Sequence, residues 1–410
     1  MISYAEAICI LRASASTGPT ELIDTCNAVN RIMADDFHAP FGLPRFNNSG
    51  MDGFALRAVD TISASISTPV SLPVLRAQAA GDPAGKGVAG NAVQIMTGGA
   101  IPDGMDSVVP IESVTTTIDA SGNVTHIRLT SPVPIHDSIR FAGDDFADGQ
   151  CLIKGGTRLQ PAHIAILYAT GTIRIKVIAP PMVSILTTGK EVSDTYQKPL
   201  GSTQVYDSNT PYLISALGTA GIPSSYAGHV GDDEARFRTL LTEAAPAQIL
   251  VSSGAVSKGK WDFIPSVLRD IGAEILFHRV SIKPGKPVLF ARLPNNRYFF
   301  GLPGNPISTV IGLRFFLMPL LRQILGMSEE TPEWAQLAAP YDKTGDLRLF
   351  LKSHVTTDPT GRSVIDLLQG QESFKISPFL NTNAWAILDE TPRSYNKGQA
   401  VMYYPNDLLR

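Results

Sequence analysis

The stretch MVSILTTGKEV, residues 182–192, places a short apolar run directly before a polar turn that contains a glycine. The run at 182–188 is rich in aliphatic residues and ends in two threonines, which predicts a buried strand. Helix and strand patterns then alternate along the chain, at 208–221, 224–230, 232–245 and 247–253. Because strands that alternate with helices form parallel sheets with crossover connections, this region predicts a three-layer α/β domain.

The regions on either side have other patterns. Residues 25–142 carry short alternating apolar runs between Gly, Pro, Ser and Thr, which predicts a β-rich domain. Similar runs at 329–410 predict a small β-barrel or sandwich. Residues 1–24 and 143–179 are short and partly helical, so we expect them to pack together as one discontinuous domain. With the α/β region at 180–328, the sequence predicts four domains.

Composition excludes several classes of protein. Hydrophobic residues make up 44% of the 410, charged residues 17%, and the net charge is -3, as in soluble globular proteins. The absence of a basic tract argues against nucleic acid as a partner. The three cysteines lack a CxxC or Cys/His spacing, which argues against a disulfide framework or structural zinc and favours a reducing compartment, the cytoplasm.

Two apolar segments raise the question of a membrane. MISYAEAICILRAS (1–14) has no basic start and no cleavage site, so it predicts an amphipathic helix rather than a signal peptide. ISTVIGLRFFLMPLL (307–321) is shorter than the ~20 residues that span a bilayer and contains Arg314, so it predicts a buried helix. No membrane association is expected.

Polar, glycine-containing loops follow the predicted strands, and their sequences are TTGKE (187–191), SSGAVSKGKWD (252–262), SIKPGKP (281–287) and GLPGNPIS (301–308). Ligands of open α/β sheets bind at the carboxyl ends of the strands. The loops therefore predict a pocket at this edge.

Ser253, Gly254 and Ser257 in the second loop permit backbone N–H groups to face a phosphate, with the following helix adding its positive end. The loop lacks the GxxxxGK[ST] spacing of a Walker P-loop. An ordinary strand-to-helix loop explains the same residues.

The other two loops combine rigidity with positive charge. Lys283 and Lys286 flank a proline and a glycine, and Pro303, Gly304 and Pro306 form a stiff turn at a helix start. Solvated lysines and a structural cap are the simpler interpretation of each loop alone. Together they concentrate positive potential at one edge, which indicates an anionic ligand.

Acids lie at strand ends or helix starts of the same region, namely Glu191, Asp232, Asp233 and Asp262. Such carboxylates suit Mg²⁺ held together with substrate oxygens, although helix caps or surface acids explain each one singly. Asp52, Thr97 and Asp145 stand in glycine-rich turns outside the α/β region, from which they reach the pocket only across a domain or subunit boundary. The histidines are scattered without metal spacing, which favours structural roles.

Seven motifs in order resemble the molybdopterin molybdenumtransferase family (MoeA, with the E domain of gephyrin as its eukaryotic counterpart). The motifs are LPRFNNSGMDGFALR, IMTGGAIPDGMDSVVPIE, IRFAGDDFADGQCLIKGG, SILTTGKEV, VSSGAVSKGKWDF, SIKPGKP and GLPGNPIS. The resemblance covers nearly the whole chain and is greatest between 42 and 320.

The resemblance implies a homodimer of four-domain chains whose α/β domain is a MogA/MoaB-like molybdopterin-binding domain. It implies the last step of molybdenum cofactor assembly, in which adenylated molybdopterin receives molybdenum from molybdate with Mg²⁺-dependent release of AMP. The site would lie between the α/β domain and the 25–142 region of the other subunit. Molybdoenzymes would be the clients that receive the product.

Matched motif by motif, the resemblance implies catalytic roles for Asp52, Thr97, Asp145, Glu191, Asp233 and Asp262. Glu191, Asp233 and Asp262 would hold the Mg²⁺. Together with the loop residues above, the predicted binding set is Ser253, Gly254, Ser257, Arg279, Lys283, Lys286, Pro303, Gly304 and Pro306.

The sequence departs from the family at four positions. Lys190 and Lys260 stand where acids are usual, Ala255 replaces a glycine, and Lys352 replaces an arginine. The two lysines favour oxyanions over Mg²⁺, which puts metal choice and turnover in question. The alternative function is therefore a paralogue that carries pterin or molybdate to a molybdoenzyme without turnover. A scaffold role has no support, because the chain has no long linker.

Overall fold

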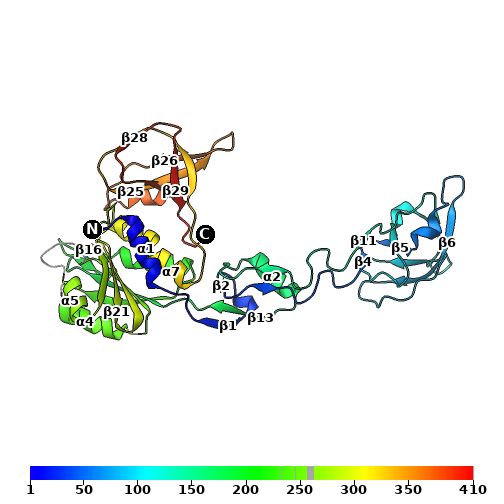
Figure 1. Ribbon diagram of the computed structural model, residues 1–410, viewed down its shortest axis with the longest axis horizontal. Coiled ribbons are helices and arrows are strands. Elements are labelled where there is room, and N and C mark those ends of the chain that lie inside the picture. The colour runs from blue at the N-terminus through cyan, green and yellow to red at the C-terminus, as the bar shows by residue number, and fades with distance from the viewer. Residues whose placement is uncertain (232, 245, 256–262, 410) are drawn as a thin grey trace. The chain divides into compact units, whose positions relative to one another are not determined.

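The computed structural model describes residues 1–231, 233–244, 246–255 and 263–409. The apolar run predicted as a strand at 182–188 forms β14 (Val183–Thr188), in which every residue is buried. β14 belongs to a six-stranded sheet (Figure 1). In spatial order its strands are β17 (Ser224–Val230), β14, β18 (Ile249–Ser253), β22 (Arg297–Leu302), β21 (Leu289–Leu293) and β19 (Glu274–His278).

The sheet is mixed rather than fully parallel. β17, β14, β18 and β22 run parallel, whereas β21 runs antiparallel to both β22 and β19. The expectation of a parallel sheet was wrong for this edge. Only the short turn η4 (Pro294–Asn296) joins β21 to β22, and a link of that length permits a hairpin but no crossover helix.

Helices cover both faces of the sheet. On one face, Ile185 and Val251 pack in a core with α1, α3, α6 and α7; on the other, Leu186 and Leu250 pack in a second core with α4 and α5. The bounds are α1 (Tyr4–Ser14), α3 (Asn209–Thr219), α4 (Glu234–Glu243), α5 (Ile264–Asp270), α6 (Pro306–Gly312) and α7 (Met318–Ile324). The alternation of side chains between the two faces of each strand produces the three predicted layers.

The helical stretch Pro306–Ile324 is long and apolar enough to cross a membrane by length and composition. It consists of α6, the π-helical turn η5 (Leu313–Leu317) and α7. Of its most apolar window, 89% is buried inside the protein. This confirms the prediction of a buried core helix.

The C-terminal strands close into a five-stranded barrel, because β25 pairs with both β26 and β27. Around the barrel the strands are β25 (Arg348–Thr357), β26 (Ser363–Leu367), β23 (Glu333–Leu337), β29 (Ala400–Pro405) and β27 (Ala384–Leu388). Lys352, fully buried in β25, donates from Nζ to the carbonyls of Gly370 and Lys375 at 2.6 and 2.9 Å. β20 (Ile282–Lys283) joins β25 in parallel.

Two distant segments form one small sheet. β1 (Thr20–Asp24) and β2 (Ile32–Met33) both pair with β13 (Arg174–Ile178), and α2 (Pro161–Ala169) precedes β13 in the chain.

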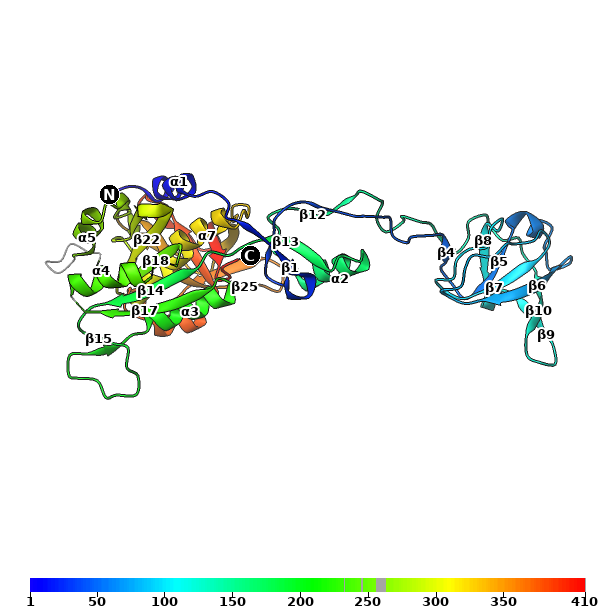
Figure 2. The same ribbon diagram turned by 90° about the horizontal axis from the view of Figure 1, so that it is seen from below.

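A second group of strands forms the β-rich region (Figure 2). Its six-stranded sheet has the order β8 (Ser107–Pro110), β5 (Gly53–Leu56), β7 (Ala92–Ile95), β6 (Val70–Gln78), β10 (Val124–Leu129) and β9 (Thr115–Ile118). Two short ribbons accompany it, β4 (Asn48–Ser49) with β11 (Ile139–Arg140), and β3 (Phe37–His38) with β12 (Cys151–Ile153).

Contacts divide the chain into two compact units. Unit 1 comprises residues 1–35, 155–168 and 172–410, and unit 2 comprises 36–154 and 169–171. The predicted fold class, a multidomain α/β and β protein with a C-terminal barrel, is confirmed. The four domain boundaries stay a prediction.

Candidate active site

A cavity of about 620 Å³ opens at the carboxyl ends of β14, β18 and β22 in unit 1. Three of the predicted loops line it, as does the turn before α3. The lining residues are Thr187, Thr188, Gly189, Lys190, Glu191, Val192, Val205, Tyr206, Asp207, Ser208, Asn209, Ser253, Gly254, Ala255, Gly304, Asn305 and Pro306. Its size and mixed polarity suit a small-molecule site.

Asn209, the first residue of α3, joins three elements at the floor of this cavity. Its Nδ2 donates to Ser253 Oγ at 2.7 Å and to the Gly304 carbonyl at 2.8 Å. These bonds connect α3 to the end of β18 and to the turn that follows β22. One side chain therefore sets the spacing of the loops.

Asp207 is 4% exposed and bonds to both α3 and β14 beside this cavity. Its Oδ2 accepts from Thr187 Oγ1 at 2.6 Å, and its Oδ1 accepts from the backbone N–H groups of Asn209 and Thr210 at 3.0 and 3.1 Å. The carboxylate thus caps α3 and links it to β14.

Gly254 is required by a close approach between two loops. Its φ is +103°, and a Cβ at this position would lie 2.5 Å from Thr188 Oγ1. Thr188 Oγ1 in turn donates to the Ser253 carbonyl at 3.0 Å. The loops after β14 and β18 can therefore touch only where the side chain is a hydrogen atom.

Glu191 and Lys190 bring opposite charges to the cavity. His229 Nε2 lies 2.7 Å from the carbonyl of Gly189 in the same loop. The Glu191 carboxylate has no hydrogen-bond or ion-pair partner among the residues that the structure describes. Glu191 is therefore an anionic group that is available to a ligand.

The two proline-containing loops lie together at this edge. α6 begins at Pro306, and its N-cap residue Asn305 makes no side-chain bond to the helix. Gly285 of the SIKPGKP loop packs on α6, since a Cβ there would lie 3.5 Å from Ile311 Cγ2 and 3.7 Å from the Ser308 carbonyl. The positive end of α6 therefore faces the cavity, with the cationic loop against its side.

The predicted cations themselves lie outside the cavity wall. Lys283 and Lys286 are exposed, and Pro303 is buried, where its carbonyl accepts from Thr309 Oγ1 at 2.7 Å. Arg279 is half-buried with a φ of +79°, and its Nε is buried without a hydrogen-bond partner in the part of the chain that the structure describes.

Of the three predicted metal ligands, the structure places Glu191 at the cavity. Asp233 is the N-cap of α4, where its Oδ1 accepts from the N–H groups of Ala235 and Arg236 at 2.9 and 3.0 Å. Asp262 lies outside the described residues, and so do Ser257, Lys260 and Asp232. The predicted roles of all these residues stay predictions.

Unit 2 brings Asp52 and Thr97 together. Asp52 Oδ1 accepts from the Thr97 backbone N–H at 2.6 Å and from Thr97 Oγ1 at 2.9 Å. These two bonds, the backbone one most, lower the pKa of Asp52 below its ordinary value. Asp145 is exposed in the turn after Gly143, with its backbone N–H bonded to the Leu43 carbonyl.

Comparison with known proteins gives the same family over both units. Residues 2–171 match the profile of the MoeA N-terminal region (domain I and II), and 184–323 match that of a probable molybdopterin binding domain. The chain is 34% identical to the molybdopterin molybdenumtransferase of Synechococcus elongatus and 31% identical to that of Haemophilus influenzae, each over 95% of both chains. The crystal structure of a molybdopterin biosynthesis MoeA protein from Pyrococcus horikosii superposes with a TM-score of 0.83 at 27% identity, covering 99% of each chain.

The chain belongs to the molybdopterin molybdenumtransferase family. The predicted family is confirmed, and with it the prediction of an enzyme of molybdenum cofactor biosynthesis. The probable molybdopterin binding domain contains the whole lining of the cavity.

Sequence reasoning missed Asp207 and Asn209, although both line the cavity of this molybdenumtransferase family member. The predicted helix at 208–221 excluded Asp207 and gave Asn209 no role beyond the helix start. No signal in the sequence distinguished them, because Asp, Ser and Asn before a helix are ordinary capping residues.

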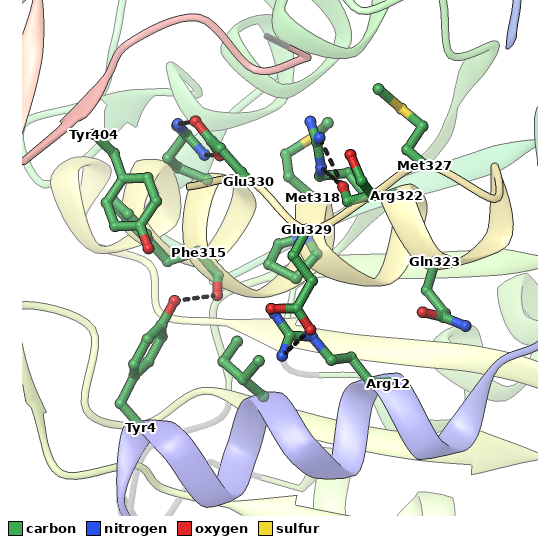
Figure 3. Close-up of a pocket in the computed structure, with 14 residues that line it drawn as sticks. Tyr4, Arg12, Phe315, Met318, Arg322, Gln323, Met327, Glu329, Glu330 and Tyr404 are labelled. Atoms are coloured by element: carbon green, nitrogen blue, oxygen red, sulfur yellow. Dashed lines mark hydrogen bonds and ion pairs between the residues drawn. The ribbon is translucent and has the colours of Figure 1, made fainter. Parts of the chain in front are cut away.

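A second cavity, of about 60 Å³, lies between α1, α7 and the C-terminal strands (Figure 3). Arg314 donates to Glu330 through two bonds of 2.6 and 2.7 Å, and Arg12 pairs with Glu329 at 2.6 Å. Arg322 donates to the Ser328 carbonyl at 2.8 Å. Because these charges already have partners and the space is small, the cavity is structural.

Proposed function

We propose that this protein is a molybdopterin molybdenumtransferase: it binds adenylated molybdopterin and molybdate in the 620 Å³ cavity, transfers molybdenum to the dithiolene and releases AMP. One observation carries the proposal. Two of the loops that the sequence predicted to bind an anionic ligand, those after β18 and β22, are joined by Asn209 inside the region that matches a molybdopterin binding domain.

The polar groups of the cavity support binding of a phosphate-linked pterin. The positive end of α6 favours phosphate and molybdate oxygens, and Arg279, Lys283 and Lys286, which lie outside the cavity wall, are the proposed cations. The Nε of Arg279, which has no hydrogen-bond partner among the described residues, is a donor that an oxyanion would satisfy. Val205 and Tyr206 are exposed on the wall and offer an apolar surface to the pterin ring.

Glu191 supports a Mg²⁺ site, because its carboxylate faces the cavity without a partner among the described residues. Mg²⁺ is commonly held by one or two carboxylates together with substrate phosphates. When bound, the ion would neutralise charge on the phosphate oxygens as AMP leaves. Asp233 and Asp262 are the further proposed ligands.

We further propose a cytoplasmic homodimer in which Asp52, Thr97 and Asp145 of one copy serve the cavity of the second, and which passes its product to molybdoenzymes. The low pKa of Asp52 supports an ionised carboxylate there. Mixing inactive Asp52→Ala and Glu191→Gln chains tests this arrangement. If Asp52 acts across copies, mixed dimers regain one intact site and AMP release returns; if it acts within its own chain, the mixture stays inactive.

The function itself is tested by incubating the purified protein with adenylated molybdopterin, Mg²⁺ and either molybdate or tungstate. A transferase releases AMP in proportion to metal inserted. Lys190 at the cavity favours the alternative of a carrier, which would bind the pterin and release no AMP. That outcome would replace the transferase proposal.

A further inference from the structure

The ribbon of β3 and β12 in unit 2 collects three potential metal ligands that are far apart in the sequence. Among the described residues, one ligand atom each from Asp36, His38 and Cys151 lies within 4.8 Å of the others. Cys151 Sγ is 3.7 Å from Asp36 Oδ2. Asp36 and His38 are exposed and Cys151 is half-buried, so solvent ions reach all three.

The backbone explains why the three side chains meet. His38 and Cys151 are direct partners across the antiparallel pair, and such partners place their side chains on the same face. Asp36 precedes His38 by two positions, and residues two apart on extended chain also share a face. The register shift between Cys151 and Ile153 leaves Ile153 buried on the opposite side.

We propose that Asp36, His38 and Cys151 form a binding site for one Zn²⁺-class cation. A carboxylate, an imidazole and a thiolate are the donor types that Zn²⁺ accepts, whereas Mg²⁺ and Ca²⁺ take oxygen donors only. Donor atoms around a tetrahedral Zn²⁺ lie roughly 3.5 Å apart, so a small rotation of the three side chains closes the site. Solvent supplies the fourth ligand.

Lys154 competes for this position. Its Nζ donates to Asp36 Oδ2 at 2.8 Å, and its side chain is 72% exposed. The ammonium already provides a positive charge beside Asp36, and it can move into solvent when a metal ion arrives. An ion pair explains the contact of Asp36 with Lys154, and the strand pairing of His38 with Cys151 places two further donor types beside that carboxylate.

The position of the site indicates what an ion would do there. The main segment of unit 2 begins at Asp36 and ends at Lys154. A cation bound by Asp36, His38 and Cys151 would therefore link β3, near the start of this segment, to β12, near its end. This consequence is independent of the proposed transferase chemistry.

Cobalt binding tests the proposal. Untagged full-length protein, stripped by a chelator, is titrated with Co²⁺ in excess Mg²⁺, so that oxygen-only sites stay filled by Mg²⁺. We expect one Co²⁺ per chain with a thiolate-to-Co²⁺ charge-transfer absorption, displaced by Zn²⁺. Zinc should also slow hydrogen exchange in the β3–β12 ribbon.

Variants separate the site from adventitious binding. Cys151→Ser should abolish the absorption and His38→Gln should weaken binding by more than about tenfold, since even outer-shell partners are worth about 10–100-fold. Lys154→Ala should strengthen binding. Cys9→Ser and Cys26→Ser, at exposed thiols elsewhere, are the matched controls and should change nothing.

Any of three results would overturn the site: absorption that persists in Cys151→Ser, absorption that is lost in a control variant, or no thiolate band in the unmodified protein. Unchanged affinity in Lys154→Ala would refute the competition by the ammonium.

Discussion

Two of the cavities in unit 1 both contain charged side chains, but those charges are satisfied in different ways. In the small cavity the charges are paired, as in the two hydrogen bonds that Arg314 donates to Glu330. In the large cavity, hydrogen bonds from Asn209 and Asp207 fix the loops, while the described structure leaves the Glu191 carboxylate without a partner. Paired charge therefore stabilises the fold at Arg314 and Glu330, whereas the Glu191 carboxylate in the large cavity is open to a ligand.

Breaking the pair in the small cavity should have the largest effect on stability. Glu330→Gln removes the charge that balances Arg314, which is 2% exposed, and leaving one member of a buried ion pair unbalanced costs about 3–5 kcal/mol. Urea denaturation measures this loss. Glu329→Gln, whose pair with Arg12 is exposed, should cost less than about 1 kcal/mol. Equal losses would break the distinction between paired core charge and surface charge.

Gly254→Ala should distort the large cavity. The new methyl group would meet Thr188 Oγ1 in a backbone conformation that side chains rarely adopt, which costs about 1–3 kcal/mol. We expect lower stability and weaker binding of adenylated molybdopterin. Gly218→Ala in α3, where a Cβ meets nothing within 4 Å, should be neutral or slightly stabilising. Full binding by Gly254→Ala would show that ligand binding does not depend on the close contact between Gly254 and Thr188.

Asn209→Ala should destabilise the loops after β18 and β22 by less than Gly254→Ala does. The loss of its two hydrogen bonds is expected to cost about 1–2 kcal/mol of unfolding free energy and to weaken binding of the pterin. Calorimetry measures both. Ser208→Ala, exposed and without a side-chain cap bond, should change stability by less than about 0.5 kcal/mol. A similar result for both variants would contradict the role given to Asn209.

Thr97→Val should have the smallest of these effects, a shift in the pKa of the exposed Asp52 carboxylate in unit 2. Removing the hydroxyl donor should raise the pKa of Asp52 partway to its ordinary value, because the backbone donor remains. A lowered pKa adds stability above the pKa of the unfolded chain, and this contribution is lost as pH falls through the lower folded value. Carboxyl NMR titration measures the shift, and an unchanged pKa would refute the contribution of the hydroxyl.

Much of the fold follows from local pattern. The apolar run at 182–188, the helix starts and the glycine turns predicted the α/β layers, because these signals lie within one element. The antiparallel edge was not foreseen, since strand direction depends on the length of the link between β21 and β22. The sequence pointed to Ser253, Gly254, Gly304 and Pro306 at the cavity, but not to Asn209, whose role arises only when three distant loops meet. His38 and Cys151 escaped notice for the same reason, because strand pairing alone makes them neighbours.

The most direct test of the account is the rate of AMP release by Glu191→Gln. We predict a loss of at least about tenfold, because the available carboxylate of the cavity would lose its charge. Glu274→Gln, an exposed acid of β19 paired with Arg292, should retain the full rate. If Glu191→Gln released AMP as fast as Glu274→Gln, the transfer reaction would not depend on the open charge of this cavity, and the central claim would be wrong.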